Sequence, residues 1–336
     1  MKRAAPARSF GPTLLGWYDA QHRLLPWRGT RDPYRIWVSE IMLQQTRAEA
    51  VIPYYERFLE RFPSAADLAA ACEEDVLASW SGLGYYSRAR NLHQAARRMA
   101  GVFPSGYQAI RELPGVGEYT AAAVASIAFD RPYAALDGNV MRVVARVTND
   151  PADIGSTRTR ARFREWAQRY LNEVNRRAGA FNQAMMELGA TVCLPRAPRC
   201  GDCPVAALCQ ARRAGTQRQL PVKLRKTQPV KIEMAVAVIQ RRGRLLLWQR
   251  PADSRRLAGF WELPSPDQLP ESHTLPEIGA FRHTITHHHY RVTVRASRLA
   301  PKTRVSLPLR WIPIDTLPTL PLSTTTRKAL RLAGLF

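Results

Sequence analysis

The chain has 336 residues, 46% of them hydrophobic, which is enough for about two domains with buried cores. Fifty lysines and arginines outnumber 27 aspartates and glutamates and give a formal net charge of +23. We therefore expect a polyanionic partner, the alternative being a protein whose basic charge only keeps it soluble. No apolar run approaches the roughly 18 residues of a membrane span, and the N-terminal MKRAAPARSF lacks the apolar centre of a secretory signal, which predicts a cytoplasmic protein with no membrane partner.

Residues 13–25 predict one helix, and the proline-marked loop LPWRGTRDPYRIW follows it with Trp27 and Arg28. An aromatic ring beside a cation suits a nucleic-acid cleft, although a tryptophan at such a place is also typical of a core. The next stretch, IWVSEIMLQQT, predicts an apolar helix that contains Glu40. Burial raises the pKa of a carboxyl toward the range in which it acts as an acid near neutrality, but the pattern also fits a Glu40 that faces solvent.

Thr46 and Glu49 have the T-x-x-E spacing of a capping box, which predicts that the next helix begins there and leaves Gln45 at the junction. Helical periodicity returns over residues 65–80, where Cys72 is expected to be a small buried hydrophobe. The following SGLGYYSRAR predicts a glycine turn, with Leu83 and Tyr85, that leads into an arginine-bearing helix. An apolar side chain displayed there suits a wedge into a base stack, while the simpler interpretation is that Leu83 caps an apolar cluster.

The turn LPGVG precedes a predicted helix of small residues, 118–129. Gly115 and Gly117 indicate either a close approach of the backbone to another group or positive φ angles. Bare N–H groups at such a helix start form an anion site, for which a phosphate is the expected occupant, although a plain helix connection with a glycine cap fits the same residues. After the helix-breaking DRPY, Asp137 begins the apolar run GNVMRVVAR. It is either an N-cap or a carboxylate placed near the sugar of the bound nucleotide.

Two more helical runs lie within residues 157–190, and four cysteines follow at the spacing C-x6-C-x2-C-x5-C: Cys193, Cys200, Cys203 and Cys209. Four thiolates suit a [4Fe-4S] cluster, whereas structural zinc usually uses two paired C-x2-C knuckles and disulfides are disfavoured in the cytosol. The first cysteine loop also carries Arg196 and Arg199, which a cluster would hold out toward a phosphate backbone.

Residues 212–231 are basic and proline-bearing and predict a linker. MAVAVIQ, the turn RRG and RLLLWQ then predict a β-hairpin, and FRHTITHHHYRVTVRAS has a strand-like end. The hairpin with WELP resembles a Nudix-type fold. The acidic sequence that holds catalytic magnesium in that fold is absent between Pro264 and Phe281, which removes a pyrophosphohydrolase function. The adjacent histidines 287–289 lack a carboxylate or cysteine partner at metal-binding spacing.

The turn LPGVG, the helix after it and Asp137 together resemble the helix-hairpin-helix motif and aspartate of the DNA glycosylase superfamily that includes endonuclease III. Together with Glu40, the four cysteines and the degenerate Nudix-like region, these features make the chain similar over nearly its whole length to the adenine DNA glycosylases of the MutY type. This resemblance implies a mainly α helix-hairpin-helix domain over 1–211 with a [4Fe-4S] module at about 190–211, a linker over 212–231, and a smaller α+β Nudix-like domain over 232–336 that recognises 8-oxoguanine. It also implies a monomer, associated with the bacterial nucleoid through DNA.

The implied partner is double-stranded DNA with adenine mispaired with 8-oxoguanine or guanine. Breaking the bond from adenine to deoxyribose needs a proton on the leaving base and shelter for a cationic sugar. Glu40 would supply the proton and later help activate water. Asp137, kept ionised by the helix N-terminus, would stabilise the sugar cation or bond to it covalently. By the same resemblance Trp27 and Gln183 contact the flipped adenine, Arg28 and Tyr119 line its pocket, Asn139 positions water, and Gln45, Leu83 and Tyr85 fill the gap on the opposite strand. Thr46, Gly115 and Gly117 complete the implied DNA contacts.

Two alternatives remain. One is an endonuclease III-like lyase on oxidised pyrimidines, in which a lysine stands at the place of Tyr119 and attacks the sugar. The other is a noncatalytic iron-sulfur DNA-binding protein. The sequence also departs from its family in one place: where MutY-type enzymes commonly carry Phe-Ser-His against 8-oxoguanine, this chain has Ile285, Thr286 and His287. Thr286 keeps the hydroxyl, and Ile285 loses aromatic stacking.

Overall fold

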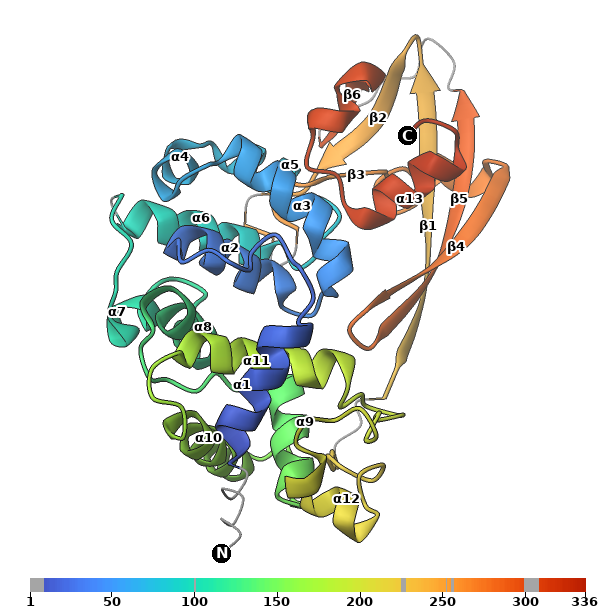
Figure 1. The fold of residues 1–336 in the computed structure, drawn as a ribbon. Coiled ribbons are helices and arrows are strands. Elements are labelled where there is room, and N and C mark those ends of the chain that lie inside the picture. The colour runs from blue at the N-terminus through green and yellow to red at the C-terminus, as the bar shows by residue number, and fades with distance from the viewer. Residues whose placement is uncertain (1–8, 100, 225–227, 252, 255–256, 299–307) are drawn as a thin grey trace, which may run out of the picture. The chain divides into compact units, whose positions relative to one another are not determined.

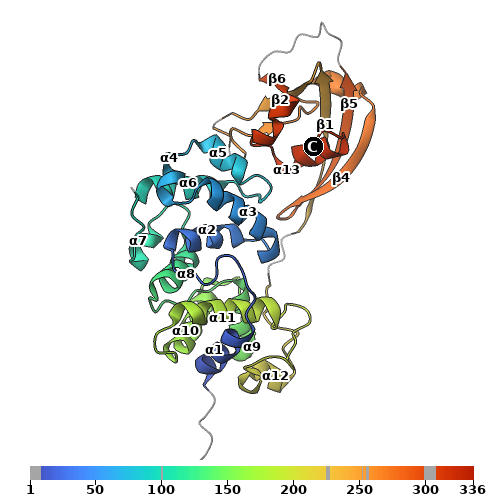
Figure 2. The same ribbon diagram turned by 45° about the horizontal axis from the view of Figure 1, so that its top comes forward.

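A computed structural model describes residues 9–99, 101–224, 228–251, 253–254, 257–298 and 308–336, so residues 1–8 and part of the predicted linker lie outside the described residues. The chain divides into two compact units (Figures 1 and 2). The first combines Met1–Ala69 with Gln94–Lys226, and the second combines Ala70–His93 with Thr227–Phe336. The stretch 70–93 thus groups with the C-terminal part of the chain, and the last division falls inside the basic segment 212–231.

The first unit is helical, which confirms the predicted fold class of the N-terminal part. Its helices are α1 (Phe10–Gln21), α2 (Pro33–Leu43), α3 (Ala48–Arg61), α7 (Tyr107–Arg111), α8 (Glu118–Phe129), α9 (Gly138–Val147), α10 (Thr157–Asn172), α11 (Ala178–Thr191) and α12 (Gln210–Ala214), with a single 3₁₀ turn η1 (Ala206–Leu208). The helices α4 (Ala65–Ala70) and α6 (Ser87–Met99) each have residues in both units, and α5 (Glu73–Ser79) belongs to the second.

Helix α8 lies at the centre of the first unit, packed between α2 and α11 (Figure 1). Its small side chains are almost all buried, so its neighbours come very close. Where α11 crosses α8, a Cβ on Gly179 would lie 2.7 Å from both the Ser126 carbonyl oxygen and the Ile127 Cα. Only glycine permits this close approach of α11 to α8.

Aspartates begin two of the helices that carry the site. Asp32 accepts hydrogen bonds from the backbone N–H of Tyr34 and Arg35 at the start of α2, and Asp137 accepts one from Val140 N at 2.7 Å at the start of α9. Such caps satisfy N–H groups that a helix leaves unpaired. The predicted N-terminal position of Asp137 is confirmed.

Two predictions of local structure were wrong. Thr46 and Glu49 form no capping box, since Arg47 is the N-cap of α3 without a side-chain bond and the Glu49 carboxylate instead pairs with Arg23 at 2.7 Å. Cys72 is neither buried nor helical. It is exposed and precedes α5 as its N-cap residue.

The described residues of the second unit form a six-stranded sheet: β1 (Val230–Arg241), β2 (Arg244–Gln249), β3 (Trp261–Glu262), β4 (Glu277–Ile285), β5 (His288–Arg298) and β6 (Leu309–Pro313). Their order is β3-β2-β1-β5-β4, with β6 also paired to β2. Strands β1 and β5 are parallel, and the other pairs are antiparallel. Helix α13 (Thr324–Leu332) packs against β1, β4 and β5, and two 3₁₀ turns complete the unit, η2 (Pro270–Thr274) and η3 (Ile314–Thr319).

The predicted hairpin is confirmed. Arg241 pairs with Arg244 across a two-residue turn in which Arg242 and Gly243 have φ angles of +46° and +72°. Two left-handed residues match the twist of the flanking strands, and the glycine adopts that conformation without strain. The sheet with helix α13 confirms the predicted smaller α+β fold of the C-terminal part of the chain.

Candidate active site

A pocket of about 860 Å³ lies in the first unit. Residues of α2, α8, α9, α11 and the loop between α1 and α2 line it, and they include nine of the predicted site residues: Trp27, Arg28, Glu40, Gln45, Thr46, Tyr119, Asp137, Asn139 and Gln183. Because these residues are spread over more than 150 positions of the sequence, the fold alone brings them together.

Glu40 is buried on α2, with 5% of its surface exposed, so the alternative of a solvent-facing carboxylate was wrong. The Tyr119 hydroxyl donates a hydrogen bond of 2.6 Å to Glu40 Oε2. Burial raises the pKa of Glu40 to about 7, and the Tyr119 bond offsets part of that rise while the nearby Asp137 charge adds to it. Burial therefore brings the protonation of Glu40 into the range of neutral pH.

Asp137 is held at the N-terminus of α9 with both carboxylate oxygens in use. Oδ1 accepts from Val140 N at 2.7 Å, and Oδ2 accepts from the Asn139 amide nitrogen at 2.9 Å. Burial raises the pKa of Asp137 above its ordinary value, and the hydrogen bonds from Val140 N and Asn139 offset part of that rise. Both bonds still favour the ionised form, because both oxygens act as acceptors.

Arg142 holds Asn139 in place from the next turn of α9. Its Nη2 donates to Asn139 Oδ1 and to the Gly189 carbonyl, each at 2.7 Å, and its Nε donates to the Cys193 carbonyl at 2.8 Å. The helices α9 and α11 touch at this point, since a Cβ on Gly189 would lie only 2.5 Å from the Asn139 Cβ. A continuous set of hydrogen bonds thus connects Asp137 to the start of the cysteine loop.

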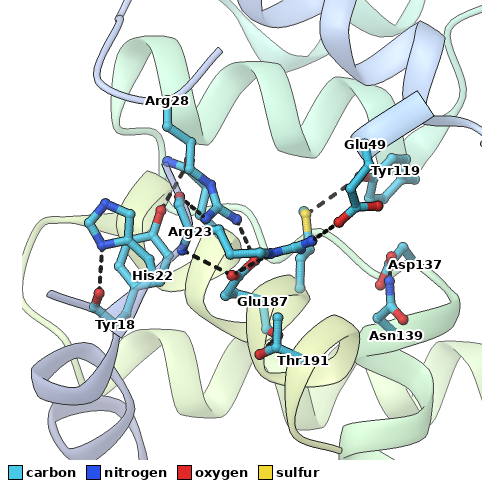
Figure 3. A network of polar contacts seen from close by, with 12 residues as sticks. Tyr18, His22, Arg23, Arg28, Glu49, Tyr119, Asp137, Asn139, Glu187 and Thr191 are labelled. Atoms are coloured by element: carbon cyan, nitrogen blue, oxygen red, sulfur yellow. Dashed lines mark hydrogen bonds and ion pairs between the residues drawn. The ribbon is translucent and has the colours of Figure 1, made fainter. Parts of the chain in front are cut away.

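Glu187 on α11 is a buried carboxylate of the pocket that was not among the predicted site residues. Figure 3 shows Arg23 and Arg28 converging on it. Arg23 Nε donates to Oε1 at 2.8 Å and Arg28 Nη2 donates to Oε2 at 2.7 Å, and these bonds lower the pKa of Glu187 to about 2 despite its burial. A signal was present, because Glu187 follows Gln183 by four residues and so lies on the same helix face. The Gln183 Oε1 accepts from the Tyr18 hydroxyl at 3.2 Å.

The four predicted cysteine ligands line one small cavity that the α9 residues Val143 and Arg146 also border. Arg146 is almost fully buried, and its Nη1 donates to the Cys193 Sγ at 3.2 Å while its carbonyl lies 3.4 Å from the Cys209 Sγ. Burial raises the pKa of Cys203 to about 12, because four thiols gathered away from water resist ionisation. Among the described residues, no three His, Cys, Asp or Glu side chains converge on a single-ion site.

The remaining predicted contacts lie outside the pocket. Gly115 has a positive φ of +74°, whereas Gly117 is the N-cap of α8 with φ −92°, which leaves for Gly117 only the alternative of a close approach by another group. No atom lies within 4 Å of an added Cβ at Gly117, which leaves the start of α8 open to an approaching group. Arg196 and Arg199 are both exposed, and Arg199 also donates to the Thr191 carbonyl at 2.6 Å.

Four predicted residues belong to the second unit. Leu83, the proposed wedge, is 8% exposed, whereas Tyr85 beside it is 39% exposed with φ +49°. Thr286 and His287 form the two-residue turn between β4 and β5, and the exposed Thr286 has φ +55°.

No helix in the described part of the chain has the length and apolar character needed to cross a membrane. Residues 38–169 match the HhH-GPD superfamily of base excision DNA repair proteins, and residues 234–332 match the NUDIX domain family. Among solved structures, a thermostable thymine-DNA glycosylase superposes with a TM-score of 0.54 and 30% identity over 61% of this chain and 95% of its own.

Two curated relatives cover nearly all of the chain. The adenine DNA glycosylase of Homo sapiens is 35% identical over 411 residues, which span 97% of this chain and 74% of the human protein. That of Mus musculus is 35% identical over 406 residues, spanning 98% of this chain and 78% of the mouse protein. The chain therefore belongs to the adenine DNA glycosylase family of the HhH-GPD superfamily, and it is an enzyme that removes adenine from DNA in base excision repair.

Proposed function

We propose that the protein is a monofunctional glycosylase that flips adenine mispaired with 8-oxoguanine or guanine out of double-stranded DNA and removes it by hydrolysis. The observation that carries this proposal is the state of Glu40, whose pKa is raised to about 7 and which is hydrogen-bonded to Tyr119. It shares its pocket with a carboxylate, Asp137, whose two oxygens are both occupied as acceptors. Two carboxyl groups in different environments are what an acid and an ion stabiliser require.

In the proposed reaction, Glu40 gives its proton to N7 of the flipped adenine while the bond from N9 to the sugar C1′ breaks. Adenine leaves as a neutral base, and the sugar becomes an oxocarbenium ion. The Glu40 carboxylate then takes a proton from the water that attacks C1′ and is restored to its starting state. Tyr119, as the donor to Oε2, fixes which carboxyl oxygen faces the base.

Asp137 is proposed to stabilise the sugar cation. Asn139 binds Oδ2, and Arg142 holds the Asn139 amide in turn, so the carboxylate has little freedom to rotate. A negative charge fixed before the cation forms needs no reorganisation during the reaction, which is the basis of electrostatic preorganisation. Asn139 is also proposed to position the attacking water.

The flipped adenine is proposed to lie against Trp27 and Gln183, with Arg28 at the wall of the pocket. Trp27 is 7% exposed and packs edge-on against Tyr55 at 5.4 Å, which gives a rigid apolar surface for a base. Arg28 is fixed by Glu187 at 2.7 Å. The Glu187 carboxylate thus neutralises part of the positive charge beside the base and orients the guanidinium.

The rate of adenine release should depend on pH through Glu40. Only the protonated carboxyl donates, so we expect the single-turnover rate to fall about tenfold per pH unit above the Glu40 pKa of about 7. It should level off below that pH and fall again where Asp137 gains a proton. A rate that stays constant from pH 6 to pH 9 in single-turnover assays would exclude Glu40 as the acid.

Tyr119 distinguishes hydrolysis from lyase chemistry. Its hydroxyl bonds to the proposed acid and cannot form a Schiff base, whereas an amine at this position can attack C1′. We expect Tyr119→Lys to gain strand cleavage and to give a protein–DNA adduct on borohydride reduction, with Tyr119→Phe as the matched control that gives neither. An active Tyr119→Lys enzyme that forms no adduct would show that this side chain does not reach the sugar.

DNA contacts outside the pocket are proposed for Gly115 and Gly117, whose turn presents the N-terminus of α8 to a backbone phosphate. Gln45 and Thr46 line the pocket itself, and Gln45 has a left-handed φ of +59°. Tyr85, with Leu83, is proposed to fill the gap on the opposite strand. The formal charge of +23 supplies the nonspecific attraction to DNA.

The four cysteines are proposed to hold a [4Fe-4S] cluster as their thiolates. The fit is supported by the arrangement of the four thiols around one cavity and by the Arg146 N–H at the Cys193 Sγ, which would stabilise a thiolate. The cluster would fix the loop that carries Arg196 and Arg199. Its role in this proposal is structural.

Recognition of the opposite base is proposed for Thr286 and His287. A β-branched residue with φ +55° is strained, and strain of this kind persists where the surrounding structure holds it. The hydrogen bond from Val230 N to the His287 carbonyl at 2.8 Å ties the turn to β1. The Thr286 hydroxyl would form a hydrogen bond with the edge of 8-oxoguanine that differs from guanine.

We expect Thr286→Ala to lower the preference for A:8-oxoG over A:G duplex by about fivefold, the loss of roughly 1 kcal/mol from one hydrogen bond. The measurement is the ratio of the two dissociation constants in a Glu40→Gln background, which prevents turnover. Thr286→Ser is the matched control, because it keeps the hydroxyl. An unchanged ratio in Thr286→Ala would place the discrimination elsewhere.

The proposed function as a whole is tested with duplexes that contain A:8-oxoG, A:G or thymine glycol, each analysed with and without alkali. We expect release of adenine from the first two and strand breaks only after alkali. Breaks without alkali, or activity on thymine glycol alone, would favour the endonuclease III-like lyase, and no release would favour a noncatalytic DNA-binding protein. Sedimentation of the free and DNA-bound protein tests the proposed monomer. The proposed site of action is the nucleoid DNA of a bacterial cytoplasm.

A further inference from the structure

The second unit contains a strained turn between α5 and α6 that the reaction itself does not use. Gly82, Gly84 and Tyr85 all have positive φ, at +108°, +72° and +49°. Glycine adopts such angles freely, but Tyr85 carries a Cβ and is held in this conformation at a cost in free energy. Tyr85 is nevertheless the exposed aromatic side chain of the turn. The surrounding contacts must therefore fix it.

Arg88, in the first turn of α6, contacts the turn through both hydrogen bonds and ring packing. Its Nη2 donates to the carbonyls of Leu83 and Gly84, at 3.3 and 3.2 Å. Its guanidinium carbon lies 5.5 Å from the centre of the Trp80 ring and 5.3 Å from that of the Tyr85 ring. One planar cation thus joins two carbonyls of the turn to the aromatic residues on both sides of it.

The base of the turn is anchored within the same unit by the C-terminal part of the chain. The Gly82 N–H donates to the Tyr86 hydroxyl at 3.3 Å, and the Tyr86 ring packs on the fully buried Phe260 with centroids 4.1 Å apart. The Ser81 hydroxyl donates to the Leu322 carbonyl at 3.0 Å. Both ends of the turn are therefore fixed. Between them, the Trp80 indole N–H donates to the Gly84 carbonyl at 3.2 Å, and Arg88 is the residue that contacts both this carbonyl and the Tyr85 ring.

Arg88 is buried, since only 9% of its surface is exposed. Burial lowers its pKa to about 10, which is far enough above neutrality for the guanidinium to stay charged. A cation this deep within aromatic rings is poorly placed for a phosphate, in contrast to the exposed arginines elsewhere on the chain.

We propose that Arg88 is a positioning residue for base extrusion: by binding the Leu83 and Gly84 carbonyls and packing against the Tyr85 ring, it holds Tyr85 ready to enter the gap that the flipped base leaves. The inference rests on the proposed function, in which the turn fills that gap. It adds a buried arginine that never touches DNA to the residues that decide how readily the base leaves the stack.

The first test needs no DNA. Hydrogen exchange of the backbone amides of residues 82–87, followed by mass spectrometry, measures how firmly the turn is held. We expect about tenfold faster exchange in Arg88→Gln and a smaller increase in Arg88→Lys, which keeps a cation but not the planar fork. Arg57→Gln is the matched control, because Arg57 stacks on the Tyr54 ring at 4.9 Å on an exposed face of α3. Unchanged exchange in Arg88→Gln would overturn the proposal.

The second test measures base extrusion in the Glu40→Gln background, with 2-aminopurine next to the target adenine of an A:8-oxoG duplex. We expect Arg88→Gln to reduce the fluorescence increase on binding at least about threefold, and Arg88→Lys to restore part of it. The slope of log affinity against log salt should stay unchanged, whereas a lost phosphate contact would reduce it by about one. Faster exchange with unaltered fluorescence, or a reduced salt slope, would contradict the positioning role.

The two proposals fail differently. Wild-type protein that releases no adenine from either mispair would overturn the proposed function. Wild-type release with Arg88→Gln indistinguishable from wild type in both tests would overturn only the role of Arg88. If Arg88→Gln does not fold, Arg88→Lys decides the question: wild-type exchange and fluorescence in that variant would show that the planar fork has no positioning role.

Discussion

Replacing Glu40 by glutamine is expected to abolish adenine release while binding to A:8-oxoG duplex persists. The amide has the size of the carboxyl, and its oxygen still accepts the hydrogen bond that Tyr119 donates to Oε2 at 2.6 Å. It cannot give a proton to N7 of adenine, and general acid catalysis of this kind contributes about 10²- to 10⁴-fold to a rate. We therefore expect single-turnover release to fall by about three orders of magnitude or more.

Glu56→Gln is the matched control for this measurement, because Glu56 is an exposed carboxylate on α3 of the same unit and does not line the pocket. Release by Glu40→Gln within tenfold of wild type would remove Glu40 from the acid role. Simultaneous loss of binding to DNA would show that the variant disturbs the pocket rather than the chemistry.

The same substitution should make the protein more stable at alkaline pH. The pKa of Glu40 is raised from 4.5 to about 7, so the folded state binds its proton more tightly than the unfolded chain does. The stability that this proton contributes is complete below pH 4.5, is lost between 4.5 and about 7, and stays lost above that range. The shift corresponds to about 3 kcal/mol, so Glu40→Gln should unfold at a higher temperature than wild type at pH 8 but not at pH 4.

Replacing Cys200 by serine is expected to have the second large effect, loss of the cluster and of the cysteine loop. The wild-type protein should be brown, with iron and sulfide in equal amounts. Removal of one thiolate should release the iron, lower the melting temperature and weaken DNA binding, because the loop that carries Arg196 and Arg199 loses its fixed shape. Loss of phosphate contacts would also reduce the salt dependence of binding, by about one unit of slope for each contact.

Cys72→Ser separates this effect from a general sensitivity to cysteine loss, because Cys72 is exposed and lies outside the cysteine loop. We expect this control to keep its iron, its melting temperature and its affinity for DNA. Stoichiometric zinc without iron in the wild-type protein would contradict the proposed cluster. A Cys200→Ser protein with unchanged iron content would show that Cys200 is not a ligand.

Features with a local cause could be predicted from the sequence alone. The turn LPGVG, the N-cap at Asp137 and the two-residue hairpin turn at Arg242 and Gly243 each depend on a few adjacent residues whose backbone preferences are strong. The spacing of the four cysteines is likewise a local feature, and it predicts a metal site with four sulfur ligands. The composition and net charge indicated the kind of partner, since long-range attraction depends on total charge rather than on shape.

Only the tertiary structure decided the state of the catalytic carboxyl. Helix α2 is buried along nearly all of its length, so it has no polar face against which periodicity could be read, and the sequence left the direction of Glu40 open. Burial against α8 placed it on the Tyr119 hydroxyl and raised its pKa. The ion pairs of Glu187 with Arg23 and Arg28 join positions about 160 residues apart, which no local pattern records.

Contacts between residues far apart in the sequence also explain why residues 70–93 fold with the second unit and not with their neighbours in the chain. By sequence, residues 70–93 belong with the helices around them, but apolar and hydrogen-bonding partners from the C-terminal part of the chain hold this segment in the second unit. The amphipathic pattern of a helix predicts that one face is buried, but it does not predict which element packs against that face. The sequence therefore determined that a glycine turn with Tyr85 exists, whereas the packing of Tyr86 on Phe260 and of Arg88 on the turn decided how it is held.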